Sequence, residues 1–514
     1  MHTWAMRLGR RFLPSTLSTV RLIVLVGLVL AGGGAQIANA QPPEPWTAPE
    51  QLSAGLLDES GQPLSLSFPT MVADSNGTVH AFWTRLHREE DVTFDGLLFY
   101  SRWDGGAWLA PVDVLLSART VIWRPQAAID AAGRIHLVWT AGFGEPIWYS
   151  SVTAAEAGSA RAWSEPQQVS GSRTSGVGIA IDRQGRCHVV FCSGDQDDRC
   201  YYTASSDGVE WLSPSLVLAG CPDCDAHVAV DERGRLHAIF GSQGTDGTVM
   251  YYSRSEDGGG HWQAALELDR AGDNYSENYG PSWGTVTTQG RDEVHVIWFG
   301  APSGQRWHCW SKDGGVTWSQ PQQISSDHRG LTLPVATAFD SAGTLHLVSM
   351  GRRETPVLLT GAFHITWRGG RWSEPSLIGS RSDWDAEYAA AVVAGGNRIV
   401  AAWTDKEGPK GTNQIWVSTL ALDAPRLEAQ GVEPSTLPSV TPTVEQENAQ
   451  PTPSAAGTEA SPTPTSLSPL QGAGGSGAGS AQRGWLVYLV GVLPPLILVV
   501  LTLLVRGARQ RRGG

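Results

Sequence analysis

The stretch Asp74-Ser75-Asn76-Gly77-Thr78-Val79-His80-Ala81-Phe82-Trp83 recurs, with variations, seven times along the chain. A complete copy has an apolar segment, a turn of the form Asp-x-x-Gly, and a second apolar segment that carries a histidine. Glycine tolerates the positive φ of such tight turns, so the pattern is typical of a β-hairpin. The histidines of neighbouring copies are 49 to 58 residues apart. The further copies are Asp130–Trp139, Asp182–Phe191, Asp231–Phe240, Asp340–Ser349, one without the aspartate through His295–Trp298, and a degenerate one through Arg398–Trp403.

Each unit contains four candidate strands. The second unit has apolar strands at 126–129, 134–140 and 147–150, and the segment Trp163-Ser164-Glu165-Pro166 then begins the fourth. Proline is acceptable there because an outermost strand needs no further ladder donor. A period near fifty residues with four short strands per unit predicts a β-propeller.

Tryptophans of the predicted fourth strands determine the blade number. One precedes the first unit, whereas none follows the last unit, so Trp46-Thr47-Ala48-Pro49 is expected to complete the last blade and close the ring. The prediction is an all-β, seven-bladed propeller, and six blades is the alternative if the first or last unit is not a true blade. The tryptophans are Trp46, Trp108, Trp163, Trp211, Trp262, Trp318 and Trp372.

The chain ends predict export and a membrane anchor. Residues 1–40 combine arginines, an apolar run at 22–30 and a small-residue cleavage site, as in a signal peptide, although an uncleaved anchor is the alternative. Residues 485–505 form an uncharged apolar run followed by arginines, which predicts a transmembrane helix and a basic cytoplasmic tail at 506–514. A cleavable sorting tail has the same outline.

These boundaries place a propeller at 41–422 and a disordered linker at 423–484, rich first in Pro/Thr and then in Gly/Ser. The expected location is the cell membrane, as a single-pass type I protein with its propeller outside. A net charge of −13 disfavours nucleic acid as a partner. We expect a monomer that uses no cofactor and no metal.

Histidines and cysteines have structural interpretations. Six histidines are in register, and five of them follow an aspartate by six residues, so we expect them to bond to the hairpin turn, with a metal ring as the alternative. Outside the cell disulfides are expected: Cys192 with Cys200, and Cys221 with Cys224 or with Cys187. A zinc site of Cys192, Cys200, Cys221 and Cys224 is the alternative. The histidines are His80, His136, His188, His237, His295 and His346.

A second motif lies between the third and fourth strands. Ser255–Trp262 and Ser311–Trp318 both have the form Ser-x-Asp-Gly-Gly-x-x-Trp, and Ser205–Trp211 and Tyr100–Trp108 are degenerate copies. These segments resemble the Asp-box, or bacterial neuraminidase repeat, of the sialidase-like β-propeller superfamily. The resemblance implies a structural role at the blade periphery for Ser255, Asp257, Gly259, Trp262, Ser311, Asp313, Gly315 and Trp318.

The same resemblance implies candidate site residues. Sialidases hold the carboxylate of their substrate with arginines, use a tyrosine activated by a glutamate as nucleophile, and an aspartate as acid/base. Arg124, in Trp123-Arg124-Pro125, is similar to the family's first arginine motif. The other substrate-binding candidates are Arg352, Arg353, Trp384 and Tyr388, and the catalytic candidates are Tyr275, Tyr279, Glu277 and Asp385.

Three functions follow as alternatives. The first is a surface propeller that binds glycans or other surface ligands without chemistry, because aromatic rings beside carboxylates in the entering loops are common in sugar sites. The second is a sialidase-like exo-glycosidase, which needs the arginines and Glu277 around one pocket. The third is a protein-binding scaffold, which predicts a flat apolar patch instead of a polar pocket.

Overall fold

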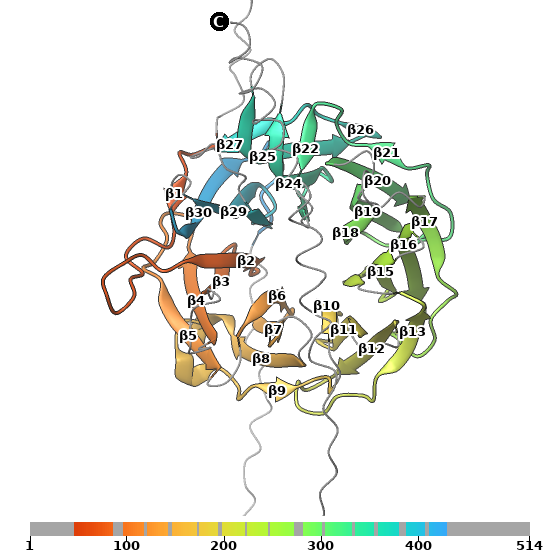
Figure 1. Cartoon of the computed structure of the whole chain (residues 1–514), viewed down its shortest axis with the longest axis horizontal. Coiled ribbons are helices and arrows are strands. Elements are labelled where there is room, and N and C mark those ends of the chain that lie inside the picture. Colours follow the sequence, from red (N-terminus) through yellow and green to blue (C-terminus); the bar gives the residue numbers. More distant parts are fainter. Residues whose placement is uncertain are drawn as a thin grey trace, which may run out of the picture. The chain divides into compact units, whose positions relative to one another are not determined.

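The protein, described here by a computed structural model, is a seven-bladed β-propeller, so the prediction of seven blades rather than six is confirmed (Figure 1). Each blade is an antiparallel sheet built on four strand positions from the ring's centre to its rim. The structure describes residues 46–85, 96–117, 121–141, 146–171, 174–193, 198–221, 224–244, 247–271, 281–300, 304–330, 335–353, 358–379, 387–406 and 411–428.

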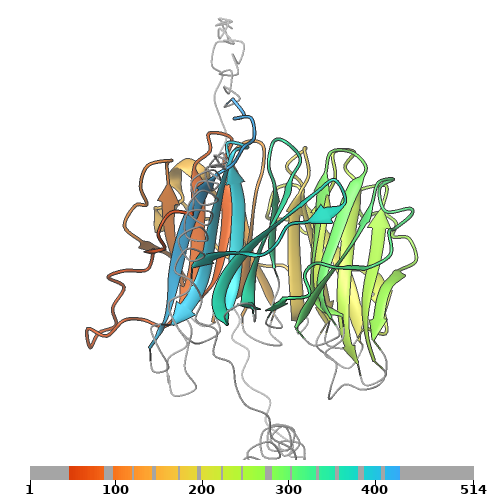
Figure 2. The same ribbon diagram turned by 90° about the horizontal axis from the view of Figure 1, so that it is seen from above.

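Four concentric sets of strands make up the ring. The innermost strands are β2 (Leu66–Ala73), β6 (Trp123–Ile129), β10 (Thr174–Ile181), β14 (Asp225–Val230), β18 (Ser282–Gln289), β22 (His328–Gly330) with β23 (Ala336–Phe339), and β28 (Glu387–Ala394). The second strands are β3 (Val79–Arg85), β7 (Arg134–Thr140), β11 (Cys187–Ser193), β15 (Leu236–Gly244), β19 (Glu293–Gly300), β24 (Leu345–Arg353) and β29 (Arg398–Lys406). Figure 2 shows the ring edge-on, with these strands running between its two faces.

The outer half of each blade is shorter and less regular. The third strands are β4 (Gly96–Trp103), β8 (Ile147–Thr153), β12 (Arg199–Ser205), β16 (Gly247–Ser255), β20 (Gln305–Ser311), β25 (Leu359–Arg368) and β30 (Asn413–Ala421). The outermost strands are β5 (Val112–Ser117), β9 (Gln167–Gln168), β13 (Ser215–Ala219), β17 (Leu266–Ala271), β21 (Gln322–Gln323), β26 (Arg371–Trp372) with β27 (Ser376–Gly379), and β1 (Glu50–Gln51). Two short 3-10 helices, η1 (Ala154–Glu156) and η2 (Ala160–Ala162), lie between β8 and β9.

The N-terminal segment closes the ring, as predicted. Strand β1 pairs with β30 of the last blade, and the Thr47 N–H donates to the Thr419 carbonyl at 2.9 Å. The buried Ser53 hydroxyl donates to Gln414 Oε1 at 2.8 Å and accepts the Ile415 N–H at 3.0 Å. Because the first and last segments share one sheet, the last blade does not end in an open edge at β30.

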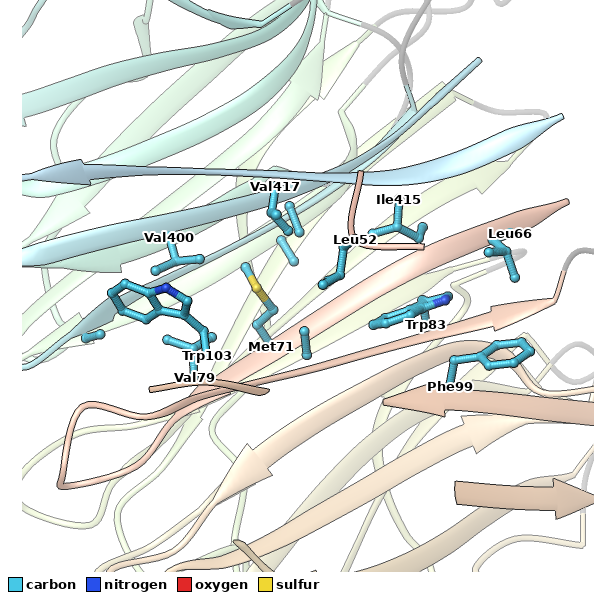
Figure 3. Packing of buried hydrophobic residues seen from close by; sticks show 14 of the residues in the cluster. Leu52, Leu66, Met71, Val79, Trp83, Phe99, Trp103, Val400, Ile415 and Val417 are labelled. Atoms are coloured by element: carbon cyan, nitrogen blue, oxygen red, sulfur yellow. The ribbon is translucent and has the colours of Figure 1, made fainter. Parts of the chain in front are cut away.

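Apolar side chains fill the junctions between neighbouring blades. At the closing junction, Met71 and Trp83 of the first blade pack against Val400 and Val417 of the last (Figure 3). Similar buried clusters lie at the six other junctions. The core is therefore a ring of interblade contacts, which keeps the inner strands in fixed positions around the centre.

The in-register histidines are buried structural groups. His136 Nδ1 lies 2.8 Å from the Tyr149 hydroxyl, and its Nε2 lies 3.3 Å from Asp130, which agrees with the interpretation of a turn-bonded imidazole. Burial lowers the pKa of His136 and keeps its ring neutral. The tyrosine partner recurs in blades 1, 3 and 4, and in blades 5 and 6 His308 and His364 take its place.

The two turns that resemble the Asp-box, at Ser255–Trp262 and Ser311–Trp318, are held by their own side chains. Asp257 Oδ1 accepts the Ser255 hydroxyl and the His261 N–H, both at 2.8 Å, while Ser255 Oγ accepts the Gly259 N–H at 2.9 Å. The box that begins at Ser311 has the same bonds. These turns lie between the third and outermost strands, at the periphery of the blades.

Each full Asp-box also packs on the preceding blade. The Trp262 and Tyr202 rings are 5.4 Å apart, and the Tyr202 hydroxyl donates to the Gly258 carbonyl at 2.8 Å. A Cβ added at Gly259 would overlap the Tyr202 ring. The second glycine of the box is therefore required by an interblade contact as well as by its own turn.

The prediction that the tryptophans open the fourth strands was wrong for most blades. Trp163, for example, precedes β9, and Ser164 still bonds to the third strand at the Ser151 carbonyl. Pro166 then interrupts the ladder because it has no N–H. Trp372, which lies in β26, is the exception. The tryptophan rings pack against the neighbouring blade, as Trp211 does on Tyr149 and Trp372 on His308.

Within the part of the chain that the structure describes, no helix is long and apolar enough to span a membrane. The predicted signal peptide (1–40), transmembrane helix (485–505) and basic tail (506–514), and nearly all of the predicted linker, lie outside the described residues.

Candidate functional site

A cavity of about 330 Å³ lies among the innermost strands at the centre of the ring. Its lining comes from all seven blades, through β2, β6, β10, β14, β18, β23 and β28. Adjacent innermost strands contact one another around this centre (Figure 1). The cavity is therefore where residues from distant parts of the chain meet.

Four side chains reach the cavity from strained backbone positions. Phe68 (φ 56°), Arg124 (φ 49°), Trp283 (φ 51°) and Tyr388 (φ 42°) all have positive φ. Each lies at an interruption of the pairing between an innermost strand and its neighbour, that is, at a β-bulge. Bulges re-aim side chains, and left-handed geometry costs about 1–2 kcal/mol for a residue with a Cβ. Such strain is concentrated at functional sites.

One position of the repeat supplies these residues. Phe68, Arg124 and Trp283 each lie twelve residues before the in-register histidine of their blade, and Tyr388 lies twelve before Val400, which takes the place of that histidine. Asp225 occupies the same position in blade 4. In different blades, this one position of the repeat therefore supplies three aromatic rings, one guanidinium and one carboxyl group to the cavity.

The aromatic rings and the guanidinium are in mutual contact. The Phe68 ring lies 4.6 Å from that of Trp123 and 4.4 Å from that of Tyr388. Arg124 Cζ lies 4.1 Å from the centre of the Trp283 ring and 6.0 Å from that of Tyr388. Such cation–π contacts fix the plane of the guanidinium. Burial raises the pKa of Tyr388, so its phenol is neutral at physiological pH.

Asp225 and His227 bring ionisable groups from β14. Burial raises the pKa of Asp225 to about 6, although the Gly284 N–H, which donates to its Oδ2 at 2.9 Å, and Arg124 both favour the ionised form. Burial lowers the pKa of His227 to about 4, and its Nδ1 accepts the Val286 N–H at 3.4 Å, so the imidazole is neutral. Among the described lining residues, Arg124 and Asp225 are then the charged pair at neutral pH.

The structure places only part of the predicted site at the cavity. Arg124 and Tyr388 line it. Arg352 and Arg353 do not: they lie at the end of β24, and Arg353 Nη1 donates to the Pro375 carbonyl at 3.3 Å, toward the outside of blade 6. The remaining candidates, Tyr275, Glu277, Tyr279, Trp384 and Asp385, lie outside the described residues.

Phe68, Trp283 and Asp225 line the cavity but do not belong to the predicted site. Their signal is the shared repeat position, which becomes visible only when the seven units are aligned on the histidine and compared column by column. A search for one family motif found Arg124 alone, because the other blades carry different residue types in that column.

The cysteines lie away from the cavity. Cys192 is bonded to Cys200 and Cys221 to Cys224, and all four are buried in the junction between blades 3 and 4. The sulfur atoms of Cys192, Cys200 and Cys224 lie within 4.8 Å of one another. Burial raises the pKa of the free Cys187 thiol to about 12, so it stays protonated and unreactive.

Comparison with known proteins supports the fold. No family model matches the sequence, and no curated protein matches it. Among solved structures, the BP39L lectin from Burkholderia pseudomallei has a TM-score of 0.50 at 14% identity, over 71% of this chain and 99% of the lectin. The Hadza microbial sialidase Hz136 has a TM-score of 0.39 at 13% identity, over 70% of this chain and 66% of that one. A polysaccharide lyase of family PL25, an ulvan lyase, has a TM-score of 0.46 at 12% identity, over 70% and 94%.

Proposed function

We propose that this chain is an exported, membrane-tethered Asp-box propeller that binds carbohydrate at the central cavity. The observation that carries the proposal is the convergence of Phe68, Trp283, Tyr388, Arg124 and Asp225 on that cavity from a single repeat position, which is strained in all of them but Asp225. The fold does not require this choice of residues, since Gly176 occupies the same column in blade 3.

The chemistry of the cavity suits a sugar. Aromatic faces stack on the C–H faces of a pyranose ring, and a few oriented polar groups bond to its hydroxyls. Arg124 offers donors and Asp225 offers acceptors, while the rings of Trp283 and Tyr388 provide the apolar walls. The volume of about 330 Å³ lies at the lower end of the range for small-molecule sites, so the site accommodates a terminal sugar rather than a long chain. A lectin with the same general fold is consistent with this use of a propeller.

A sialidase-like hydrolase is the second candidate. It is favoured by one observation, namely that Arg124, the residue in the arginine-like motif, lies at the cavity. Against it, Arg352 and Arg353 lie away from the cavity. A protein-binding scaffold predicts a flat apolar patch. It is less well supported, because exposed apolar residues such as Val209, Leu212 and Val316 lie at or next to separate peripheral turns.

The membrane part of the proposal rests on the sequence at both ends of the chain. It is tested by fractionating cells that express the whole chain or a version that stops after residue 484. Release of the shorter version into the medium, with the whole chain retained in the membrane, supports the anchor. Equal distribution of the two contradicts it.

The binding proposal is tested with the whole chain in detergent, first on a glycan array and then by calorimetry. Arg124→Ala and Trp283→Ala are each expected to weaken binding of the best glycan at least about tenfold, equivalent to about 1.4 kcal/mol. Arg102→Ala, which removes an exposed arginine of β4 outside the cavity lining, is the matched control and should bind normally.

Two outcomes would reject this proposal: no binding to any glycan by folded protein, or binding that neither cavity variant weakens. A fluorogenic α-sialoside assayed in parallel separates binding from chemistry. Turnover that is lost in Arg124→Ala and kept in Arg102→Ala would establish the hydrolase.

A further inference from the structure

The conformation of Trp283 leaves backbone groups that need a partner. The pairing of β18 with β19 is interrupted between Ser282 and Thr285, so Trp283 and Gly284 have no opposite residue in the ladder. An N–H group left without a partner in the interior costs about 1–3 kcal/mol. The Gly284 N–H is satisfied by the neighbouring blade, where it donates to Asp225 Oδ2 at 2.9 Å, and the Trp283 backbone also stabilises the carboxylate.

The surrounding glycines make room for this carboxylate. A Cβ added at Gly241, on β15, would overlap Asp225 Oδ1 and would come 3.2 Å from the Ser282 Cα. A Cβ added at Gly284 would lie 2.6 Å from Ile239 Cδ1. The Asp225 side chain thus packs closely against glycines of blades 4 and 5, and a side chain at Gly241 would displace its carboxylate from the bulge.

The geometry points to Asp225 as a positioning residue that holds the bulge of blade 5 so that Trp283 faces Arg124. The chain of contacts runs from Asp225 through the Gly284 N–H to the Trp283 ring, and from that ring to the guanidinium 4.1 Å away. Asp225 therefore acts on the ligand site through another residue, in addition to the acceptor that it offers to the cavity itself. The consequence for ligand binding rests on the proposed function, whereas the consequence for Trp283 does not.

The carboxylate should hold Trp283 in a pH-dependent way. The other ionisable groups that line the cavity are Arg124 on β6, which acts on Asp225 electrostatically, the neutral His227 on β14 and the neutral Tyr388 on β28, while β10 and β18 contribute none. Burial raises the pKa of Asp225 to about 6. Above that pH the carboxylate is ionised and its Oδ2 is a strong acceptor for the Gly284 N–H, and below it the carboxyl group carries a proton and accepts less well.

The test follows the Trp283 environment directly, with no ligand. The whole chain is labelled with 5-fluorotryptophan, and the Trp283 resonance is identified among the 22 tryptophans by its loss in Trp283→Phe. We expect this resonance to shift between pH 5 and 7 with a midpoint near 6. In Asp225→Asn, which keeps an acceptor but does not titrate, it should stay constant over that range.

Asp225→Ala should displace or broaden the Trp283 resonance at every pH, and Asp113→Ala, an exposed carboxylate of β5, should leave it unchanged. A Trp283 resonance in folded Asp225→Ala that coincides with that of the wild type would overturn the inference. If Asp225→Ala does not fold, the pH dependence of the Trp283 resonance is compared between the wild type and Asp225→Asn. A wild-type resonance that does not shift between pH 5 and 7 overturns the inference.

Ligand binding is then measured on the same variants. A displaced Trp283 with at least tenfold weaker glycan binding in Asp225→Ala, rescued in Asp225→Asn, supports both the inference and the proposed function. A displaced Trp283 without any glycan binding in the wild type supports the inference and rejects the function.

Discussion

Replacing Gly315 by alanine tests whether the Asp-boxes lock neighbouring blades together. Gly315 has φ 82°, and its N–H donates to Ser311 Oγ at 2.8 Å. A Cβ there would overlap the hydroxyl of Tyr252 in the preceding blade. That hydroxyl lies 2.7 Å from His237 Nδ1, so Tyr252 cannot withdraw without breaking a buried hydrogen bond.

The expected cost is the sum of two contributions. Left-handed geometry costs an alanine about 1 kcal/mol relative to glycine. Forcing an extra methyl into a well-packed contact costs about 1–3 kcal/mol more. Gly315→Ala should therefore lower the free energy of unfolding by about 2–4 kcal/mol. Gly290 has φ 59° with no atom within 4 Å of an added Cβ, so Gly290→Ala should cost only about 1 kcal/mol.

Urea unfolding of the whole chain, followed by circular dichroism, measures both variants. Tyr252→Phe removes the nearest colliding atom, so adding Gly315→Ala to it should cost less than adding Gly315→Ala to the wild type. Equal destabilisation by Gly315→Ala and Gly290→Ala would refute the interblade lock, because only the backbone contribution would then be present.

Three further predictions concern the ring, its disulfide and its buried histidines. Ser53→Ala should lower the free energy of unfolding by about 1–3 kcal/mol, since it leaves the Ile415 N–H without its acceptor at the closing junction, and an unchanged urea midpoint would contradict that role. Mutating Cys192 and Cys200 together to serine should cost about 2.5 kcal/mol by the loop-entropy estimate for a separation of 8 residues, and non-reducing mass spectrometry of the wild type should find that pair joined. Stability should fall as the pH drops from 6.5 toward 4, because the unfolded chain protonates His227 in that range and the folded chain, with a pKa of about 4, does not. Each unit of such a shift corresponds to about 1.4 kcal/mol, so His227→Gln should show a smaller decline over this range, and an equal decline would argue against the lowered pKa.

Much of the fold could be predicted because its signals are local. Asp74 and Gly77 specify a hairpin turn through their own backbone preferences, and the boxes at Ser255 and Ser311 specify their turns in the same way. Repetition of these local units about every fifty residues predicts the propeller. A tryptophan segment precedes the first unit and none follows the last, which predicts how the ring closes. None of these inferences needs knowledge of a contact between distant residues.

The site could be predicted only in part, because its contacts are not local. Arg124 and Tyr388, both predicted, line the cavity, whereas Arg352 and Arg353 do not, and Arg353 bonds to the Pro375 carbonyl instead. A sequence does not show to which side of a strand end a long side chain turns.

The sequence by itself therefore determined the strand-and-turn unit, the number of blades and the order of the segments, because these depend on local turn chemistry and on a regular period. Only the tertiary structure decided that Phe68, Arg124, Asp225, Trp283 and Tyr388 form one site. Neighbouring members of this set are separated along the chain by roughly one blade or more, and they meet only when the ring closes. The positive φ values of Phe68, Arg124, Trp283 and Tyr388 lie at bulges that line the shared cavity, and the hydrogen bond from the Gly284 N–H to Asp225 joins two blades, so no single repeat contains these features.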